Sequence, residues 1–246
     1  MSHFFVTSGQ IAGEELTIVG EDVNHMKNVL RMRVGEAFTA ADENGVFYHC
    51  EVETLDKQEV TAKIMWKEQG TSELSSKIYL FQGLPKSDKM ELIIQKAVEL
   101  GAYEIVPVAT KRAIVKLDAK KEASKLKRWQ AIAEGAAKQS GRMLVPKISE
   151  VKTFGEALQM AQELDINVIP YECARGMEAT REIFGSIKPG MSVGIFIGPE
   201  GGFEESEVEK AQQMNVKPVT LGKRILRTET AGLTTLSILM YLLEEA

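Results

Sequence analysis

Two glycine-containing segments near the C-terminus have the residue types of a small-molecule pocket. The first, residues 197–203, reads Ile-Gly-Pro-Glu-Gly-Gly-Phe and follows the apolar run 191–197, which predicts a buried strand. Glycines in such a turn let backbone N–H groups approach a ligand closely. The second segment, residues 221–231, lies between a predicted strand and a predicted helix. Loops at the C-terminal ends of neighbouring strands form the crevice where open α/β sheets bind small molecules, so the two segments together predict a cofactor pocket.

The elements that must position these loops alternate along the C-terminal two-thirds of the chain. We expect strands at residues 78–82, 105–109, 167–171, 193–197 and 216–221, and helices at 88–100, 122–139, 154–164, 177–184, 204–214 and 230–243. This alternation predicts an α/β fold with a parallel sheet covered by helices. The last helix is apolar around most of its circumference, so it must be buried in the core or against a partner subunit.

The first 70 residues instead predict mainly β structure. Segments 36–42 and 46–54 flank an Asn-Gly pair, which is a strong hairpin signal, and 60–67 continues the meander. A helix is expected at 22–33, with Val23, Met26 and Leu30 on its apolar face. Residues 71–76 are polar and small, as in a linker. We therefore expect two domains, residues 1–72 and 73–246.

Composition and charge narrow the class of protein. The chain has 246 residues, of which 44% are hydrophobic and 26% charged, as in a soluble globular protein. The net charge of −5 argues against a nucleic-acid partner, but residues 111–147 hold 11 Lys and Arg against 3 Asp and Glu. Such a local excess forms a footprint for a polyanion even on an acidic protein, although a solvated helix face explains it equally well.

Cysteine use and the absence of long apolar runs indicate a cytoplasmic protein. Cys50 and Cys173 lie far apart and lack metal-ligand spacing, so we expect free thiols in a reducing compartment. The start of the chain has no signal-peptide pattern, and no apolar run approaches the roughly 20 residues that span a bilayer.

Other motif interpretations fail at identifiable residues. Gly222 and Lys223 are followed by Arg224 where a Walker phosphate loop needs Ser or Thr, and the turn at Gly198 lacks the dinucleotide-binding spacing. The three histidines all lie in the predicted β domain and form no catalytic triad pattern. No set of metal ligands is apparent.

Four segments of the chain resemble one known family. Residues 86–90, 138–142, 197–203 and 221–231 resemble the RsmE family of the SPOUT methyltransferases, and residues 25–33 resemble its N-terminal PUA-like β-barrel. The match spans nearly the whole chain. The resemblance implies methylation of N3 of one uridine in the decoding region of 16S rRNA, with S-adenosylmethionine as the cofactor.

The resemblance also implies a topology that the residue patterns do not give. SPOUT domains thread their C-terminal segment through a loop to form a trefoil knot, which general rules of chain connection would exclude. Members of the family are homodimers whose site is completed by the partner. This suits the apolar last helix, although burial within one subunit also explains it.

The cofactor is expected to lie bent in the knot, with its adenine among backbone groups of three loops. In this chain the loops are residues 170–172, 198–202 and 221–231. The residues that the resemblance implies for cofactor binding are Pro170, Tyr171, Glu172, Ile197, Gly198, Pro199, Glu200, Gly201, Gly202, Leu221, Gly222, Ile225, Leu226, Arg227 and Ala231.

Methyl transfer to a uridine N3 sets further demands. The enzyme must align N3 with the methyl carbon, stabilise the developing uracil anion and help to remove the N3 proton. Arg142 and Arg227 are candidates for anion stabilisation and Glu229 for proton acceptance. Each has a structural alternative: Arg142 could hold a phosphate, Arg227 could pair with Glu229, and Glu229 could stabilise the start of the last helix. Glu200 either binds the cofactor or closes its turn.

Substrate RNA is expected to contact both domains through basic and polar side chains. The candidates are Lys27, Asn28, Arg31 and Arg33 in the barrel, and Lys111, Arg112, Lys116 and Lys138 in the methyltransferase domain. A solvent-facing surface is the alternative for the barrel residues. Two other functions stay open: a SPOUT enzyme that acts on another RNA, such as a tRNA ribose 2′-hydroxyl, and a non-catalytic RNA-binding protein of ribosome assembly.

Overall fold

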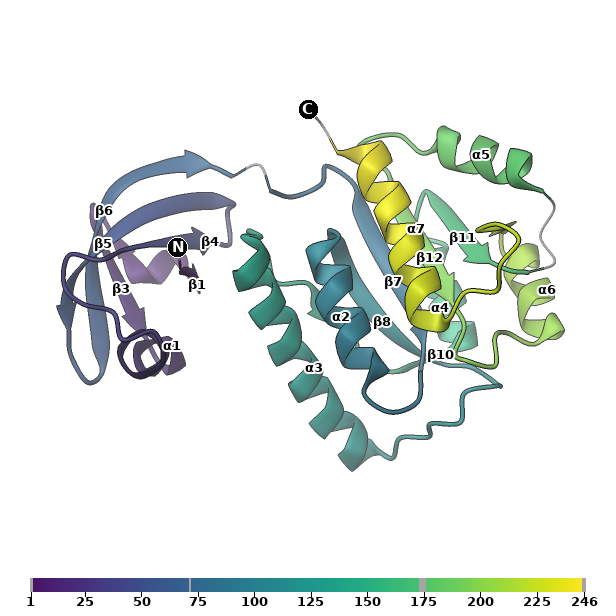
Figure 1. Ribbon diagram of the computed structural model, residues 1–246, viewed down its shortest axis with the longest axis horizontal. Helices are drawn as coiled ribbons and strands as arrows, with labels where there is room; N and C mark the ends of the chain where they lie inside the picture. The colour runs from purple at the N-terminus through teal and green to yellow at the C-terminus, as the bar shows by residue number, and fades with distance from the viewer. Residues whose placement is uncertain (1, 71, 173–175, 245–246) are drawn as a thin grey trace. The chain divides into compact units, whose positions relative to one another are not determined.

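A computed structural model describes residues 2–70, 72–172 and 176–244 (Figure 1). The chain divides into two compact units. One unit comprises Met1–Glu73 together with Ala137–Val145, and the other comprises Leu74–Ala136 and Pro146–Ala246. The predicted boundary at residue 72 took no account of the second segment of the first unit. Cys173 lies outside the described residues.

The N-terminal unit is built on a curled sheet of six strands (Figure 1). Its order is β1-β4-β5-β6-β3-β2, with β1 parallel to β4 and the other pairs antiparallel. The strands are β1 (His3–Val6), β2 (Ile11–Ala12), β3 (Glu15–Val19), β4 (Ala37–Asp42), β5 (Val46–Leu55) and β6 (Glu59–Gln69). The predicted hairpin is confirmed as β4 and β5, and Gly45 in its turn has the positive φ of 78° that the Asn-Gly signal requires.

The predicted helix over residues 22–33 is wrong in its second half. The chain forms a short helix α1 (Glu21–Asn24) and then a wider π-helical turn η2 (His25–Val29). Arg31 takes a left-handed conformation with φ of 54°, which ends the helix. Val23 and Met26 are buried as expected, but the wider turn moves Leu30 off the apolar face, and Met32 enters the core instead.

A buried ion pair fastens the second segment of this unit to the first. Arg142 is 4% exposed, and its guanidinium donates to both carboxylate oxygens of Glu73, with Nε 3.1 Å from Oε1. The same carboxylate accepts the backbone N–H groups of Met143 and Leu144. Glu73 lies in the segment expected to be a linker, so that segment has a structural role in this unit.

The C-terminal unit confirms the predicted α/β alternation. Its seven-stranded sheet has the order β10-β8-β7-β12-β11-β13, with β9 paired to β8, and every pairing is parallel. The strands are β7 (Lys77–Gly83), β8 (Ala102–Ala109), β9 (Lys147–Ile148), β10 (Lys152–Thr153), β11 (Ile166–Pro170), β12 (Ser192–Ile197) and β13 (Val216–Val219). The ends of β12, β11 and β13 therefore lie side by side, which brings the loops after them together.

Helices cover both faces of this sheet. They are α2 (Lys89–Glu99), α3 (Ala119–Ser140), α4 (Phe154–Ala161), α5 (Met177–Ser186), α6 (Glu205–Gln213) and α7 (Thr228–Leu243). Helices α2 and α7 pack against each other (Figure 1), and Gly232 of α7 lies close to Leu80. The adjacent residue Phe81 points to the opposite face and packs with residues of α4 and α6. No described helix has the length and apolar character needed to cross a membrane.

We predict that Glu73→Ala destabilises the N-terminal unit. The change removes the Glu73 carboxylate from the buried Arg142 guanidinium, which costs about 2 to 4 kcal/mol of unfolding free energy, the lower end reflecting the partial exposure of Glu73. Urea unfolding would measure this loss.

The exposed pair between His49 and Glu68, with an N–O distance of 2.9 Å, provides the control. Glu68→Ala is expected to change the unfolding free energy by less than about 1 kcal/mol. Equal losses in the two variants would show that the Arg142 pair is not the stronger constraint.

Candidate functional site

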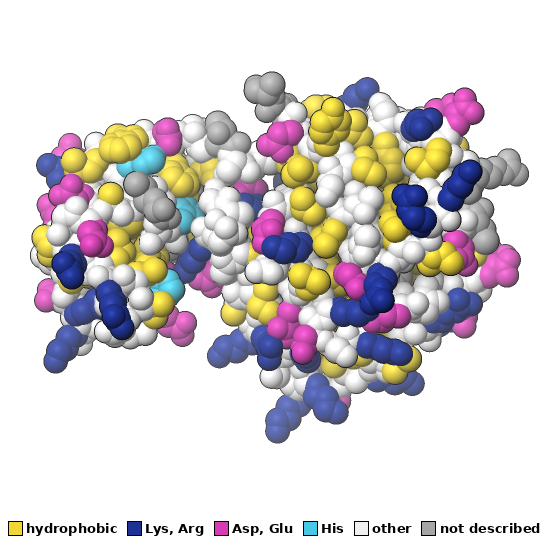
Figure 2. Space-filling view, in the orientation of Figure 1, with side chains coloured by type: hydrophobic (Ala, Val, Ile, Leu, Met, Phe, Trp, Pro, Cys, Tyr) yellow, Lys and Arg dark blue, Asp and Glu magenta, His cyan; other side chains and the backbone are white. Residues whose placement is uncertain are grey.

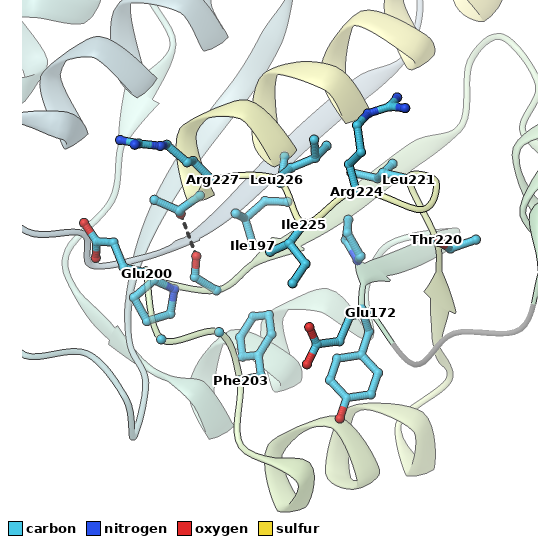
Figure 3. Close-up of a pocket in the computed structure, with 18 of the residues that line it drawn as sticks. Glu172, Ile197, Glu200, Phe203, Thr220, Leu221, Arg224, Ile225, Leu226 and Arg227 are labelled. Atoms are coloured by element: carbon cyan, nitrogen blue, oxygen red, sulfur yellow. Dashed lines mark hydrogen bonds between the residues drawn. The ribbon is translucent and has the colours of Figure 1, made fainter.

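A cleft of about 590 Å³ lies at the ends of β11, β12 and β13 in the C-terminal unit (Figure 3). Every residue expected to bind the cofactor lines it: Pro170, Tyr171, Glu172, Ile197, Gly198, Pro199, Glu200, Gly201, Gly202, Leu221, Gly222, Ile225, Leu226, Arg227 and Ala231. The volume lies within the range of roughly 300 to 1,000 Å³ typical of small-molecule sites. The structure thus brings the three predicted loops into one pocket, while their role as cofactor ligands stays a prediction.

The turn after β12 is tightly closed, and two of its positions favour glycine. A Cβ on Gly198 would lie 3.0 Å from the backbone of Gly202, and Gly202 itself has a φ of 67°. The N–H of Gly202 donates to the carbonyl of Pro199 at 2.8 Å. This compact turn leaves backbone groups at the pocket wall, where a ligand approaches them closely.

A hydroxyl group ties this turn to the start of α7. Thr228 donates its hydroxyl hydrogen to the carbonyl of Gly198 at 2.6 Å and accepts a hydrogen bond from Nε2 of Gln82 at 2.9 Å. Gln82 is fully buried at the end of β7. Neither residue's role was predicted from the sequence, although a glutamine at the end of an otherwise apolar strand was the available signal.

An ion-pair cluster at the pocket edge involves Lys89, whose role was not predicted from the sequence either. The Lys89 ammonium lies 3.3 Å from Glu200 and 3.3 Å from Glu229. Glu200 also accepts the backbone N–H of Lys86 at 3.1 Å. Partial burial raises the pKa of Glu200, but hydrogen bonds from backbone N–H groups and from Lys89 lower it by more, so the net pKa lies below its usual value. The Glu200 carboxylate therefore fastens its turn to the start of α2.

The three catalytic candidates have different surroundings. Arg227 lines the cleft, but Figure 3 shows its guanidinium directed away from Ile225 and Phe203, which face each other across the cavity. Glu229 is not among the residues that line the cleft. It lies in the first turn of α7, where its charge is favourable, and it pairs with Lys89 and not with Arg227 among the described residues. Arg142 belongs to the N-terminal unit, where Glu73 holds it.

Six of the eight expected RNA-binding side chains are exposed, but several of the eight contact other groups of the chain. Lys27 donates to the carbonyls of Leu55 and Asp56, Asn28 donates to Asn24, and Lys138 pairs with Asp22 at 2.8 Å. Lys111 pairs with Glu204 at 3.1 Å. Arg112 lines the cleft and donates to the carbonyl of Gly201 at 3.0 Å. The exposed residues among the eight candidates are Asn28, Arg31, Arg33, Lys111, Arg112 and Lys116.

The cleft is also lined by residues that were not among those expected to bind the cofactor. They are Lys89, Arg112, Phe203, Thr220, Lys223, Arg224 and Thr228. Several of them belong to the two glycine-containing segments that indicated the pocket. No group of three or more His, Cys, Asp or Glu residues in the described part of the chain is arranged to hold a metal ion.

Comparisons with known proteins match both units. A family described as the RNA methyltransferase domain matches residues 72–240, and one described as the RNA methyltransferase PUA domain matches residues 18–65. The Ribosomal RNA small subunit methyltransferase E of Bacillus subtilis is 39% identical over 98% of this chain and 96% of its own length. The chain belongs to the ribosomal RNA small subunit methyltransferase E family.

Further members of the family support this placement. The protein of the same name from Mesomycoplasma hyopneumoniae is 35% identical over 96% of this chain and 98% of its own length. A crystal structure of a Ribosomal RNA small subunit methyltransferase E from Neisseria gonorrhoeae, described as bound to S-adenosyl methionine, superposes with a TM-score of 0.85 at 33% identity and covers 98% of both chains. The resemblance drawn from the sequence motifs, and the PUA-like N-terminal domain, are therefore confirmed.

We predict that Thr228→Val makes the pocket less rigid without leaving a cavity in the core. Valine has nearly the shape of threonine but leaves Nε2 of Gln82 and the carbonyl of Gly198 without the hydroxyl, which costs about 1 to 3 kcal/mol of unfolding free energy. We expect weaker binding of S-adenosylmethionine in calorimetric titrations, because the turn after β12 loses its link to α7.

Thr235→Val is the matched control, because its hydroxyl donates within α7 to the carbonyl of Ala231, at a distance of 2.8 Å. Cofactor affinity in this variant is expected to stay near that of the unchanged protein. If Thr228→Val also kept its cofactor affinity, the hydroxyl bridge would have no role in shaping the pocket.

Proposed function

We propose that this protein transfers a methyl group from S-adenosylmethionine to N3 of a uridine in 16S rRNA of the small ribosomal subunit. The observation that carries the proposal is the convergence of residues 170–172, 197–203 and 220–228 on one cleft, in a member of the ribosomal RNA small subunit methyltransferase E family. Methyl transfer would take place in the cytoplasm, on the small subunit or its precursors.

The cleft has the chemistry that S-adenosylmethionine needs. Ile197, Ile225 and Phe203 offer apolar walls for an adenine, and the glycine turn offers backbone groups for its polar edge. Glu172 reaches into the same space in Figure 3, where its carboxylate complements a positively charged ligand. Bound S-adenosylmethionine would supply an activated methyl group on a positively charged sulfur. We further propose that the chain around residues 220–231 forms the trefoil knot of SPOUT proteins.

We assign the anion-stabilising role to Arg227. It is exposed at the edge of the cleft, so its guanidinium is available to the carbonyl oxygens of a uracil that loses its N3 proton. Glu229 is separated from the cleft lining and holds Lys89, and Arg142 is engaged by Glu73. For these two residues we favour the structural alternative.

RNA binding is proposed for both units. Arg31 and Arg33 are exposed in the N-terminal unit, and Arg112 and Lys116 are exposed in the C-terminal unit. Guanidinium and ammonium groups at such positions attract the phosphate backbone. We accordingly propose RNA binding for residues 1–72 and methyl transfer for residues 73–246, with residues 137–145 contributing to the first unit.

A homodimer is proposed from the exposed side of α7. Leu236, Leu239 and Leu243 of this helix are fully buried, but Tyr241 is 82% exposed on another side. That side borders a largely apolar groove of about 910 Å³ between α2, α5 and α7, which includes Leu92, Met177, Phe184, Leu233, Ile238, Tyr241 and Leu242. An apolar groove of this kind fits the same helix of a second copy, as in an isologous dimer.

Methyl transfer tests the proposed reaction. Labelled S-adenosylmethionine would be incubated with unmodified small ribosomal subunits, naked 16S rRNA and tRNA, and mass spectrometry would identify the modified base. We expect N3-methyluridine in the small subunit. An Arg227→Ala variant is expected to keep cofactor binding and to lose on the order of 10²-fold in transfer rate.

Other outcomes would overturn the proposal in distinguishable ways. Label on tRNA or on a ribose would assign the protein another RNA substrate. Cofactor binding without transfer to any of the three RNAs would favour a binding role in ribosome assembly.

The dimer is tested by Tyr241→Asp. A carboxylate in the apolar groove would be buried without a partner on association, so we expect a shift from dimer to monomer in light scattering. Met65→Asp changes another exposed apolar residue, on β6, and is expected to leave the dimer intact. A dimer that persists in Tyr241→Asp would place the subunit interface elsewhere.

A further inference from the structure

The loop between β8 and α3 is fastened to the pocket at its first residues. The backbone N–H of Lys111 donates to Oε1 of buried Glu207 at 3.0 Å, and Arg112 donates to the carbonyl of Gly201 at 3.0 Å. A Cβ on Gly201 would lie 3.2 Å from Cβ of Arg112, so the loop and the glycine turn are in close contact. The start of this loop is thus part of the pocket wall.

Beyond this root, the loop presents a cation, an aliphatic side chain and another cation to solvent. Arg112, Ile114 and Lys116 are exposed, while the alternate residues Ala113 and Val115 are half-buried. Ile114 is 69% exposed. No ion pair or hydrogen bond of the Lys116 side chain is found among the residues that the structure describes. Arg112 lies in a turn in which the N–H of Ala113 donates to the carbonyl of Thr110 at 3.1 Å, and the chain from residue 113 to 118 has no regular secondary structure. The three exposed groups therefore follow one another closely in a short row along the loop that starts at the pocket.

The surroundings of this row are also basic. Exposed lysines continue from Lys116 into the first turns of α3 with Lys120, Lys121 and Lys127. Figure 2 shows Lys and Arg side chains gathered along the lower edge of the C-terminal unit. An aliphatic side chain among cations does not suit an apolar protein partner, but it does suit RNA, which combines phosphates with flat apolar base faces.

The reaction itself creates a place for such a side chain. N3 of uridine lies on the base-pairing edge, so the target must be unpaired and turned out of its stack to enter a pocket. The base next to it then loses a stacking neighbour. Proteins that unstack bases commonly insert an aliphatic side chain against the exposed base face.

We propose that Ile114 packs against the base adjacent to the target uridine, while Arg112 and Lys116 hold the flanking phosphates. The loop is then an RNA-binding subsite that selects an unstacked nucleotide next to the cofactor pocket. This inference rests on the proposed function, since it takes the methylated uridine to be the nucleotide in the pocket.

Kinetics on unmodified small ribosomal subunits test the subsite. Ile114→Ala is expected to raise KM by about 5- to 20-fold, as for an aliphatic side chain that loses most of its burial, with little change in cofactor affinity or melting temperature. Ile114→Leu, which keeps an aliphatic side chain of similar size, should have a KM close to that of the unchanged protein.

Salt titrations of binding to 16S rRNA separate the aliphatic contact from the ionic ones. Lys116→Ala is expected to reduce the slope of log affinity against log salt by about 0.7, the value for one phosphate contact to a single strand. Ile114→Ala should weaken binding at every salt concentration and leave the slope unchanged.

Three results would overturn the subsite. The first is an unchanged KM and an unchanged RNA affinity in Ile114→Ala. The second is a change in the salt-dependence slope in this variant. The third is a change in its oligomeric state, which would place Ile114 against a second copy of the chain. If the unchanged protein bound 16S rRNA but transferred no methyl group, the proposed function would fail on its own, and the affinity measurements would still decide the role of the loop.

Discussion

The pocket depends on one buried hydroxyl group that joins three separate parts of the chain. Thr228 lies between Gln82 at the end of β7 and Gly198 in the turn after β12, and it begins α7. The buried amide nitrogen Nε2 of Gln82 has two hydrogens to donate: one goes to the carbonyl of Gly83 at 2.9 Å, and the other to the hydroxyl of Thr228, 146 residues later in the chain, also at 2.9 Å. The demand for hydrogen-bond satisfaction thus fixes where the loop 220–228 returns to the sheet.

The outer walls are held by ionic contacts that build on this arrangement. Lys89 joins α2 to both the glycine turn and α7 through Glu200 and Glu229, and Arg112 closes the other side through the carbonyl of Gly201. These groups are partly exposed, so each contact is individually weak. Their effect is to limit the movement of loops whose roots are already fixed by β11, β12 and β13, which is what a preformed ligand site requires.

The sequence was sufficient for features encoded by local patterns. Glycine motifs identified the pocket loops because close backbone contacts and positive φ angles favour glycine there, and Asn-Gly identified the hairpin because Gly45 has a positive φ. Long-range pairings were not predictable. The partner of Arg142 is 69 residues away in a segment that resembles a linker, and the position of Glu229 depends on Lys89 of a different helix. The wide turn at His25–Val29 also escaped prediction, because its apolar spacing fits an ordinary helix as well.

The net charge of −5 is a poor guide to the partner of this protein, because some charges are paired within the molecule and others are exposed. Glu73 and Arg142 cancel each other in a buried pair, and Lys89 lies between two carboxylates. Such groups contribute little to the field outside the molecule. The loop before α3 and the first turns of α3 carry exposed cations, and at physiological ionic strength a phosphate responds only to charges within about 8 Å. A polyanion that approaches this surface therefore meets a positive field, whatever the sum over the chain.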